Sequence, residues 1–409
     1  MTSKHYKLVT RQYLLPFILI TSLFFAWGFA RAILDVLNKH FQESMDMTIA
    51  RSTMIQATTY LGYFLMALPA GIFITRYGYR KGVVMGLLLF GAGSLMFIPG
   101  ESMCSFNFFL ISLFVIGCGL AILETAANPY VTELGDRSTA ASRLNLAQSF
   151  NGLGCILAPV TVGAFLFSSP ESSISVPYAI MGCAVLLAAL IFCRVKLPEI
   201  KTDHSIGGGD GEKSASIAST IRLLWSSRRF KMGLLALFCY EIAEISINSL
   251  FINYVTSDGW MDKMTASAVL SFGALGLFML ARVAGSWIMS RIPAEKVLLT
   301  CGIMTVVGTL LVTLDLGLPS KCGLFACYAF EAIMFPTIFA MTISHTDGNS
   351  TKIASSFLMM TPLGGAIGTM LMGFVADAAG MSTAFIVPAT AYAFVLIYAA
   401  MFATKRLKS

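Results

Sequence analysis

Hydropathy limits how this chain can fold more than any other feature of its sequence. Apolar runs follow one another along the chain, and each is close to the length of about 20 residues that a membrane-crossing helix needs. The runs cover residues 14–37, 53–75, 82–100, 106–131, 143–167, 177–196, 231–256, 264–289, 296–315, 322–345, 353–376 and 383–404. Charged residues make up only 12% of the chain, whereas soluble domains carry about 25%. We therefore expect an all-α membrane protein with twelve transmembrane helices.

One polar segment, rich in glycine and serine, separates six of these runs from the other six. We expect an N-terminal six-helix bundle over residues 1–196, a cytoplasmic linker over 197–230 and a C-terminal six-helix bundle over 231–409. An internal repeat supports two pseudo-symmetric bundles, because Glu124 in the fourth run and Glu331 in the tenth each precede a proline by five residues. Repeated halves of this kind are typical of transporters.

The distribution of lysine and arginine predicts the orientation in the membrane. Most of these residues lie in the two ends, the linker and every second loop, while the other loops hold Lys39, Arg51, Lys263 and Lys321. Positive residues concentrate on the cytoplasmic side of membrane proteins. We therefore expect both termini in the cytoplasm and the protein in the cell inner membrane. The net charge of +7 then reflects orientation in the bilayer, and we expect no nucleic-acid partner.

The fourth run carries one carboxylate, Glu124, at about the depth of the bilayer centre. An ionised side chain there costs at least roughly 2.5–3.5 kcal/mol, so an acid within the membrane is by default a functional residue. Helical spacing places Gly117, Ala121 and Asn128 on the same face. Pro129 follows and leaves the carbonyl one turn before it without its usual donor. Small residues around an acid predict a surface that lines a cavity or lies close to another helix.

The fifth run is interrupted by amide side chains, which include Asn145, Gln148 and Asn151. Polar side chains at this depth need partners, and a hydrogen-bonded seam between helices would account for one or two of them. An acid and several amides on consecutive helices exceed what such a seam explains. We therefore expect a solvated binding cavity with Asn128, Gln148 and Asn151 as substrate-binding residues.

The first run places an aromatic ring, a cation, an acid and an amide on one helical stripe. These are Trp27, Arg31, Asp35 and Asn38, which fall within an arc of about 80°. Indole rings stack on the C–H faces of sugars, and charged and amide groups orient hydroxyls, so this stripe is a candidate sugar surface. Arg31 and Asp35 are also four residues apart and could form a salt bridge that only neutralises both charges.

The seventh run adds Glu241, Glu244 and Asn248 on one face, and we count Glu244 and Asn248 among the candidate substrate-binding residues. Two acids one turn apart repel each other unless one is protonated or paired. A structural ion pair with Arg282 of the next run is an equally good interpretation. The same ambiguity applies to Glu331 in the tenth run.

Two long strings resemble a known family. LETAANPYVTELG and RLNLAQSFNGLG in the fourth and fifth runs are similar to the signature of the fucose–galactose–glucose proton symporters of the major facilitator superfamily. FAWGFARAILD resembles the family's first helix, whose acid corresponds to Asp35, although Arg31 stands where an uncharged residue is usual. The resemblance implies the major facilitator fold and symport of a monosaccharide such as fucose, glucose or galactose by a functional monomer. It also implies Asp35 and Glu124 as the proton-coupling acids.

The roles of these two acids can be separated by their neighbours along each helix. Arg31 lies one turn from Asp35 and favours its ionised form, so we expect Asp35 to accept hydrogen bonds from the sugar. Glu124 has no cation within reach on its own helix. Burial without a counter-charge favours the neutral carboxyl, and we therefore expect Glu124 to take up and release the proton.

Other classes of function lack support in the sequence. No G-x-x-x-x-G-K-[ST] loop is present to hold a nucleotide phosphate, and no Ser–His–Asp or metal-ligand set indicates an enzyme. We expect no cofactor, and only sugar, proton and lipid as partners. Two alternatives remain: a carrier for an acidic sugar whose carboxylate binds Arg31, and a membrane sensor that transports nothing.

Overall fold

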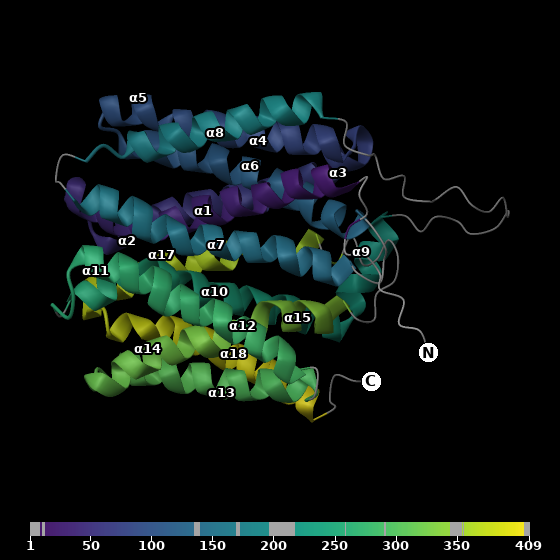
Figure 1. The fold of residues 1–409 in the computed structure, drawn as a ribbon. Helices are drawn as coiled ribbons and strands as arrows, with labels where there is room; N and C mark the ends of the chain where they lie inside the picture. Colours follow the sequence, from purple (N-terminus) through teal and green to yellow (C-terminus); the bar gives the residue numbers. More distant parts are fainter. Residues whose placement is uncertain are drawn as a thin grey trace.

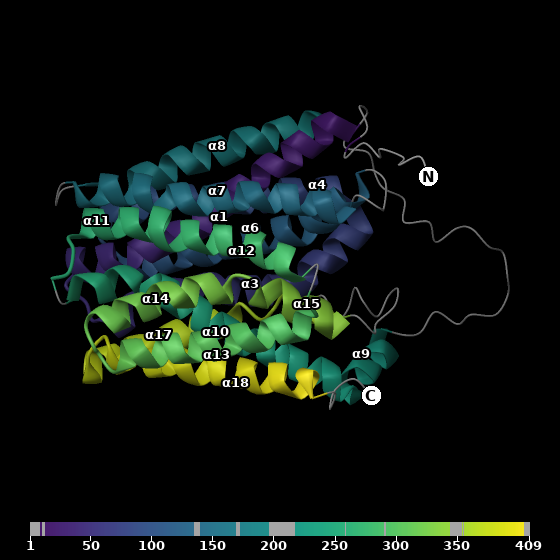
Figure 2. The ribbon, with the colours of Figure 1, turned by 60° about the horizontal axis from the view of Figure 1, so that its bottom comes forward.

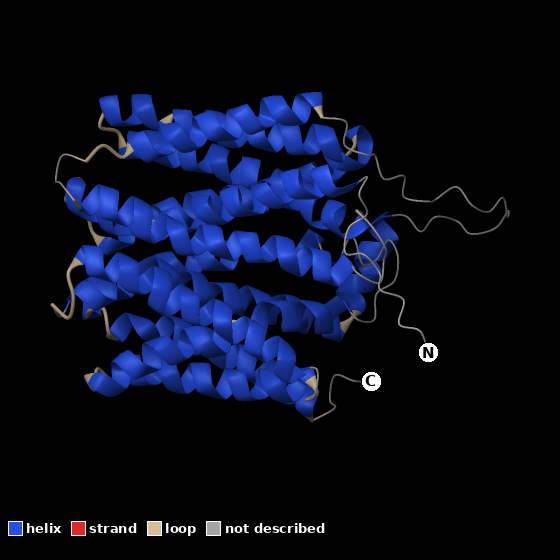
Figure 3. Cartoon of the chain, in the orientation of Figure 1, coloured by secondary structure: helices blue, strands red, loops and turns tan. Residues whose placement is uncertain are grey.

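The computed structural model describes residues 9, 13–134, 140–168, 172–195, 217–257, 259–289, 292–343, 354 and 356–404. All regular secondary structure in these residues is helical (Figure 3). They contain 12 helical segments that are long and apolar enough to cross a membrane. Helices satisfy every backbone hydrogen bond internally, which is what a chain in lipid requires. The predicted fold class is therefore confirmed, and the protein is a multi-pass membrane protein.

The first half of the chain forms one group of helices. Its elements are α1 (Leu14–Ser44), α2 (Ile49–Ser52), α3 (Met54–Tyr77), α4 (Tyr79–Leu95), α5 (Phe97–Ser102), α6 (Phe106–Glu133), α7 (Ala140–Phe167) and α8 (Ser175–Arg194). Helix α1 packs along α7, α3 along α6, and α4 against both α6 and α8. Glycine permits the first of these contacts, because a Cβ atom on Gly28 would lie 2.3 Å from the carbonyl oxygen of Asn151.

The second half forms a similar group. Its elements are α9 (Ile217–Ser226), α10 (Arg228–Ser257), α11 (Lys263–Ala268), the π-helical turn η3 (Val269–Leu275), α12 (Gly276–Met289), α13 (Ala294–Thr313), α14 (Leu318–Glu331), α15 (Met334–Ile343), α17 (Leu363–Ala379), the 3-10 turn η4 (Thr383–Phe385) and α18 (Ile386–Ala403). Helix α10 packs against α17 and α18, and α13 against α14 and α18. Residues 197–216 of the predicted linker lie outside the described residues, and α10 begins three residues before the expected start at 231.

Figures 1 and 2 show that the long helices run side by side along one direction. Helix α1 begins, α18 ends and α9 lies at one end of the bundle, which we call the terminal end (Figure 1). Helices α2, α5 and α11 lie at the opposite end, which we call the far end (Figure 1). Contacts between the first and second halves join α3 and α2 to α17, α1 to α10, and α7 to α11 and η3.

The tenth span is broken where the sequence predicts a continuous helix. Helix α14 ends at Glu331 and α15 begins at Met334. Pro336 lacks an N–H group, so the carbonyl of Ala332, four residues earlier, loses its usual donor. The Nε atom of Arg282 donates to that oxygen at 3.0 Å. Because Ala332 and Ile333 are buried, the break lies within protein, where broken helices are tolerated at membrane depth.

Candidate functional site

Four polar side chains join the two halves of the molecule beside the last third of α1. They are Asp35 and Asn38 of α1, Gln56 of α3 and Ser249 of α10, which we call the cross-half node. Gln56 Nε2 donates to Asp35 Oδ1 at 3.3 Å and to Ser249 Oγ at 3.0 Å. Asn38 Nδ2 donates to the Ser249 carbonyl at 3.1 Å and also to its hydroxyl. One serine of the second half therefore receives hydrogen bonds from two amides of the first.

Several buried acceptors in and beside this node make no hydrogen bond within the described part of the chain. They are Asn38 Oδ1, Gln56 Oε1, Asn248 Oδ1 and Glu241 Oε2. A buried acceptor without a donor costs about 1–3 kcal/mol. The three amide oxygens accept hydrogen bonds and donate none, and the same holds for a carboxylate oxygen of Glu241 when that acid is ionised. A ligand that brings hydroxyl donors to this region would therefore relieve the cost.

Glu124 lies in a second polar group built from α1, α3 and α6. Tyr63 Oη donates to Glu124 Oε1 at 3.1 Å. The guanidinium carbon of Arg31 lies 5.9 Å from the centre of the Tyr60 ring. Arg31 also interacts electrostatically with Glu124 and with Glu244 of α10. A cation from α1 therefore acts on Glu124, which reasoning along α6 alone could not detect.

The alternative of a salt bridge between Arg31 and Asp35 is not formed among the described residues. Among the described residues, contacts between carboxylates and amino or guanidinium groups within 4.0 Å are confined to Glu43 with its two lysine neighbours. Helix α3 supplies the competing partners, since Gln56 bonds Asp35 and Tyr60 lies beside Arg31. The charged form of Asp35 and the proton on Glu124 therefore stay predictions, and the helix partners of both acids enter the assignment.

On α10, Asn248 Nδ2 donates to Glu244 Oε1 at 2.9 Å. Glu241 is buried one turn earlier. The alternative of a direct ion pair from Arg282 to these acids is also not formed among the described residues. Arg282 instead donates to the Ala332 carbonyl, which Pro336 leaves without its helical donor. The guanidinium carbon of Arg282 also lies 4.6 Å from the centre of the Phe278 ring.

The predicted amide residues of α6 and α7 connect helices. Gln148 Nε2 donates to Asn128 Oδ1 at 3.4 Å, and Asn151 Nδ2 donates to the Phe24 carbonyl at 3.2 Å. The side chain of Asn145 lies outside those described. The hydrogen-bonded seam thus accounts for more of these amides than expected, and their contact with substrate stays a prediction.

Trp27 is 2% exposed, and its ring centre lies 4.1 Å from that of Phe24. In this arrangement protein covers the indole ring. Its stacking on a sugar therefore stays a prediction, and it requires the ring to be uncovered.

Sequence reasoning missed Gln56, Tyr63 and Ser249. A signal for two of them was available, because Gln56, Tyr60 and Tyr63 recur at helical spacing in an otherwise apolar run. Ser249 gave no signal, since serine is common in transmembrane helices and can bond its own backbone.

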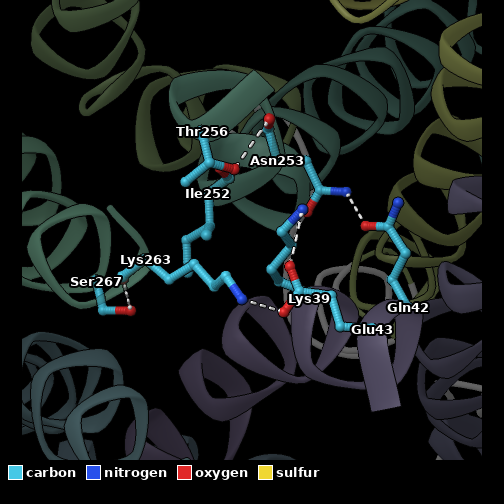
Figure 4. A network of polar contacts seen from close by, with 8 residues as sticks. All are labelled: Lys39, Gln42, Glu43, Ile252, Asn253, Thr256, Lys263 and Ser267. Carbon is cyan, nitrogen blue, oxygen red and sulfur yellow. Dashed lines mark hydrogen bonds and ion pairs between the residues drawn. The ribbon is translucent and has the colours of Figure 1, made fainter. Parts of the chain in front are cut away.

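A further set of contacts joins the halves at the far end, shown in Figure 4. Glu43 of α1 lies 3.4 Å from Lys39 of the same helix and also pairs with Lys263 of α11. Beside them, Asn253 Nδ2 of α10 donates to Gln42 Oε1 of α1 at 2.7 Å. These side chains hold α1 against α10 and α11.

A carboxylate of α17 completes the far-end contacts. Asp377 accepts hydrogen bonds from the backbone N–H groups of Ile49 at 3.0 Å and Ala50 at 2.8 Å. These groups begin α2, where backbone donors have no partner within the helix. The second half therefore caps a helix of the first half, and the two halves are in contact at the far end.

The sequence matches the family model described as Major Facilitator Superfamily over residues 17–328. The chain is 36% identical to the L-fucose-proton symporter of Escherichia coli (strain K12), across 95% of this chain and 93% of that protein. It is 34% identical to a glucose/galactose transporter of Brucella abortus biovar 1 (strain 9-941), across 93% and 92% of the two chains.

Solved structures give the same result. The crystal structure of the E. coli fucose:proton symporter superposes with a TM-score of 0.71 at 34% identity, covering 96% of this chain and 99% of that one. An inward-facing bacterial homolog of the human lysosomal transporter Spinster superposes with a TM-score of 0.76, over 97% and 98% of the two chains. At 14% identity, the second likeness concerns the fold alone.

Proposed function

Since the chain belongs to the major facilitator superfamily, and within it to the fucose–galactose–glucose proton symporters, we propose that it carries a neutral monosaccharide together with a proton. It is a membrane transporter and not an enzyme. Transport would follow alternating access, in which the two halves rock about a site between them.

The choice of substrate rests on the buried acceptors in and beside the cross-half node that have no hydrogen-bond donor. Asn38, Gln56 and Asn248 each leave an amide oxygen buried without a hydrogen bond among the described residues. A monosaccharide presents several hydroxyl donors at the spacing of one ring. An anionic substrate would bring further acceptors to a region that already holds Asp35, Glu241 and Glu244.

We assign the two acids of the first half by their observed neighbours. Arg31 and Tyr63 stabilise a carboxylate at Glu124, which supports a role in accepting hydrogen bonds from the sugar. Asp35 and Glu124 both lack an ion pair among the described residues, but Asp35 lies beside the second half, where Gln56 Nε2 bonds both Asp35 and Ser249. This position between the moving halves supports Asp35 as the group that takes up and releases the proton.

The terminal end is assigned to the cytoplasm of a bacterial inner membrane. The excess of lysine and arginine in the ends, the linker and alternate loops supports this orientation. Asp377, Glu43 and Asn253 join the two halves at the far end, which supports the proposal that substrate reaches the site from the cytoplasm in this arrangement.

Uptake in reconstituted vesicles tests the proposal. Labelled fucose, glucose and galactose are offered with and without an inward proton gradient, and with a sodium gradient as control. At least one of the sugars is expected to accumulate only with the proton gradient. Accumulation driven by sodium, or no uptake and no exchange of any of them, contradicts the proposal; a sensor that transports nothing would give the second result.

Arg31 supports one other candidate, a carrier for an acidic sugar. It has no ion pair among the described residues, and a guanidinium binds a carboxylate in a bidentate manner. Competition by galacturonate against labelled galactose distinguishes the two candidates. Strong inhibition that disappears in Arg31→Gln favours the acidic sugar, and no inhibition favours the neutral one.

A further inference from the structure

Gln56 occupies an unusual position between the proposed proton site and the opposite half. It is 1% exposed, and its single amide nitrogen donates to Asp35 of the first half and to Ser249 of the second. An amide nitrogen carries two hydrogens, so both bonds form together. Any movement that separates Ser249 from α3 removes one of the two bonds that orient this amide.

The groups that act on Asp35 come from several helices. Arg31 of α1 favours its charge, while Glu244 of α10 opposes it. Tyr60 of α3, Cys155 of α7 and Tyr328 of α14 also interact with it electrostatically. Among the described residues, only Gln56 donates a hydrogen bond both to Asp35 and to a residue of the other half.

We infer that Gln56 makes release of the proton from Asp35 depend on closure of the far end. When the halves meet, Ser249 holds the amide so that Nε2 faces Asp35. A hydrogen bond to a charged oxygen is stronger than one to a neutral oxygen, so this arrangement favours the carboxylate. The proton leaves Asp35 for the cytoplasmic solution, and Asp35 changes from a carboxyl to a carboxylate.

Linkage gives the reverse step. If closure favours the carboxylate, then protonation of Asp35 weakens closure by the same factor. With the far end open, Ser249 is withdrawn and Gln56 is no longer fixed, so Asp35 binds a proton from outside more readily. Gln56 is thus a positioning residue that gives the proton cycle its direction. This inference rests on the proposed function, in that Asp35 carries the proton.

The chain offers a matched control for this role. Gln42 also bridges α1 to α10, through Asn253 at 2.7 Å, but the hydrogen bonds described for it involve neither Asp35 nor Glu124. Gln56→Leu and Gln42→Leu therefore remove the same chemical group from the same interface. Only the first of them removes a contact with the proton site.

The experiment measures two activities of each full-length variant in oriented vesicles. Because Gln56→Leu also removes an amide oxygen offered to the sugar, exchange of labelled for unlabelled sugar is the reference: we expect the ratio of accumulation on a proton gradient to exchange to fall about tenfold in this variant, the effect of one charge-assisted hydrogen bond. We expect Gln42→Leu to keep the wild-type ratio of accumulation to exchange. A wild-type ratio in Gln56→Leu, or an equal fall in both variants, overturns the inference.

The pH profile adds a measurement that a purely structural role would not change. Without Gln56, Asp35 holds its proton more tightly, so the internal pH that gives half-maximal uptake should rise by about one unit. Ser249→Ala keeps the hydrogen bond from Gln56 to Asp35 and removes the hydroxyl that accepts from Gln56 across the halves. We expect it to shift the pH profile in the same direction, so it provides the test if Gln56→Leu does not fold. No shift in either variant overturns the inference, even when the wild type accumulates sugar. Failure of the wild type itself to accumulate sugar overturns the proposed function as well.

Discussion

Glu124 and Glu331 occupy equivalent places in the two halves, and each precedes a proline by five residues, yet their surroundings differ. Glu124 is partly exposed, accepts from Tyr63 at 3.1 Å and interacts with Arg31. Glu331 has no exposed surface. Its Oε2 atom accepts from Tyr392, while its Oε1 atom has no partner among the described residues.

The backbone differs as well. Helix α6 continues past Pro129 to Glu133, whereas α14 ends at Glu331 itself. The repeated motif therefore sets a position in the fold and leaves the role of the acid to side chains from other helices. Arg31 of α1 interacts with Glu124 and Arg282 of α12 with Glu331, but Glu331 is fully buried and bonded to Tyr392 of α18 inside the second half.

The largest difference is expected when both acids are changed to the isosteric amide. Glu124→Gln removes the charge that accepts hydrogen bonds from the sugar, and should weaken binding by about 10- to 100-fold. Glu331→Gln keeps an oxygen for Tyr392 and should leave binding unchanged. Titration calorimetry on purified protein measures both, and equal losses would contradict the contrast between the two acids.

A smaller effect is expected from Arg31→Gln, which removes the cation that acts on Glu124. Sugar affinity should fall about tenfold, because a charged donor near the carboxylate is lost. The double variant Arg31→Gln with Glu124→Gln should bind no worse than Glu124→Gln alone. Additive losses in this cycle would mean that the two side chains act on the sugar independently.

The smallest effect on binding is expected from the two tyrosines. Tyr63→Phe should weaken binding only about threefold, since Glu124 keeps its interaction with Arg31. Tyr392→Phe should leave affinity unchanged but reduce stability by about 1–3 kcal/mol, because it leaves a second buried oxygen of Glu331 without a donor. Thermal unfolding in detergent measures the second effect, and a stable Tyr392→Phe protein with impaired binding would reverse the roles assigned here.

The sequence was sufficient for the spans, because hydropathy is a local property of the chain, and it named Asp35 and Glu124 as candidate acids of the site. It was insufficient for their partners. The four-residue spacing of Arg31 and Asp35 allowed an ion pair, but Gln56 and Tyr60 of another helix lie against them. Such neighbours depend on how α1, α3 and α10 pack, which no local pattern encodes.

The break after Glu331 illustrates the same limit. Pro336 predicts a carbonyl without its donor at Ala332, but it does not predict which side chain will replace that donor. Arg282 does so from α12, and this contact explains why an arginine within the membrane need not pair with the acids of α10. Its role could be assigned only after the eighth and tenth spans had been placed side by side.

The cap that Asp377 places on α2 has a consequence for how affinity is measured. A sugar analogue too large to be enclosed can bind from outside only to molecules whose far end is open. Its measured dissociation constant then equals the intrinsic value divided by the fraction of open molecules. With about one molecule in a hundred open, the analogue would seem about a hundredfold weaker from outside than its contacts warrant. The apparent dissociation constant of an inhibitor measured on whole cells would thus depend on the stability of this cap as well as on the contacts that the inhibitor makes in the site.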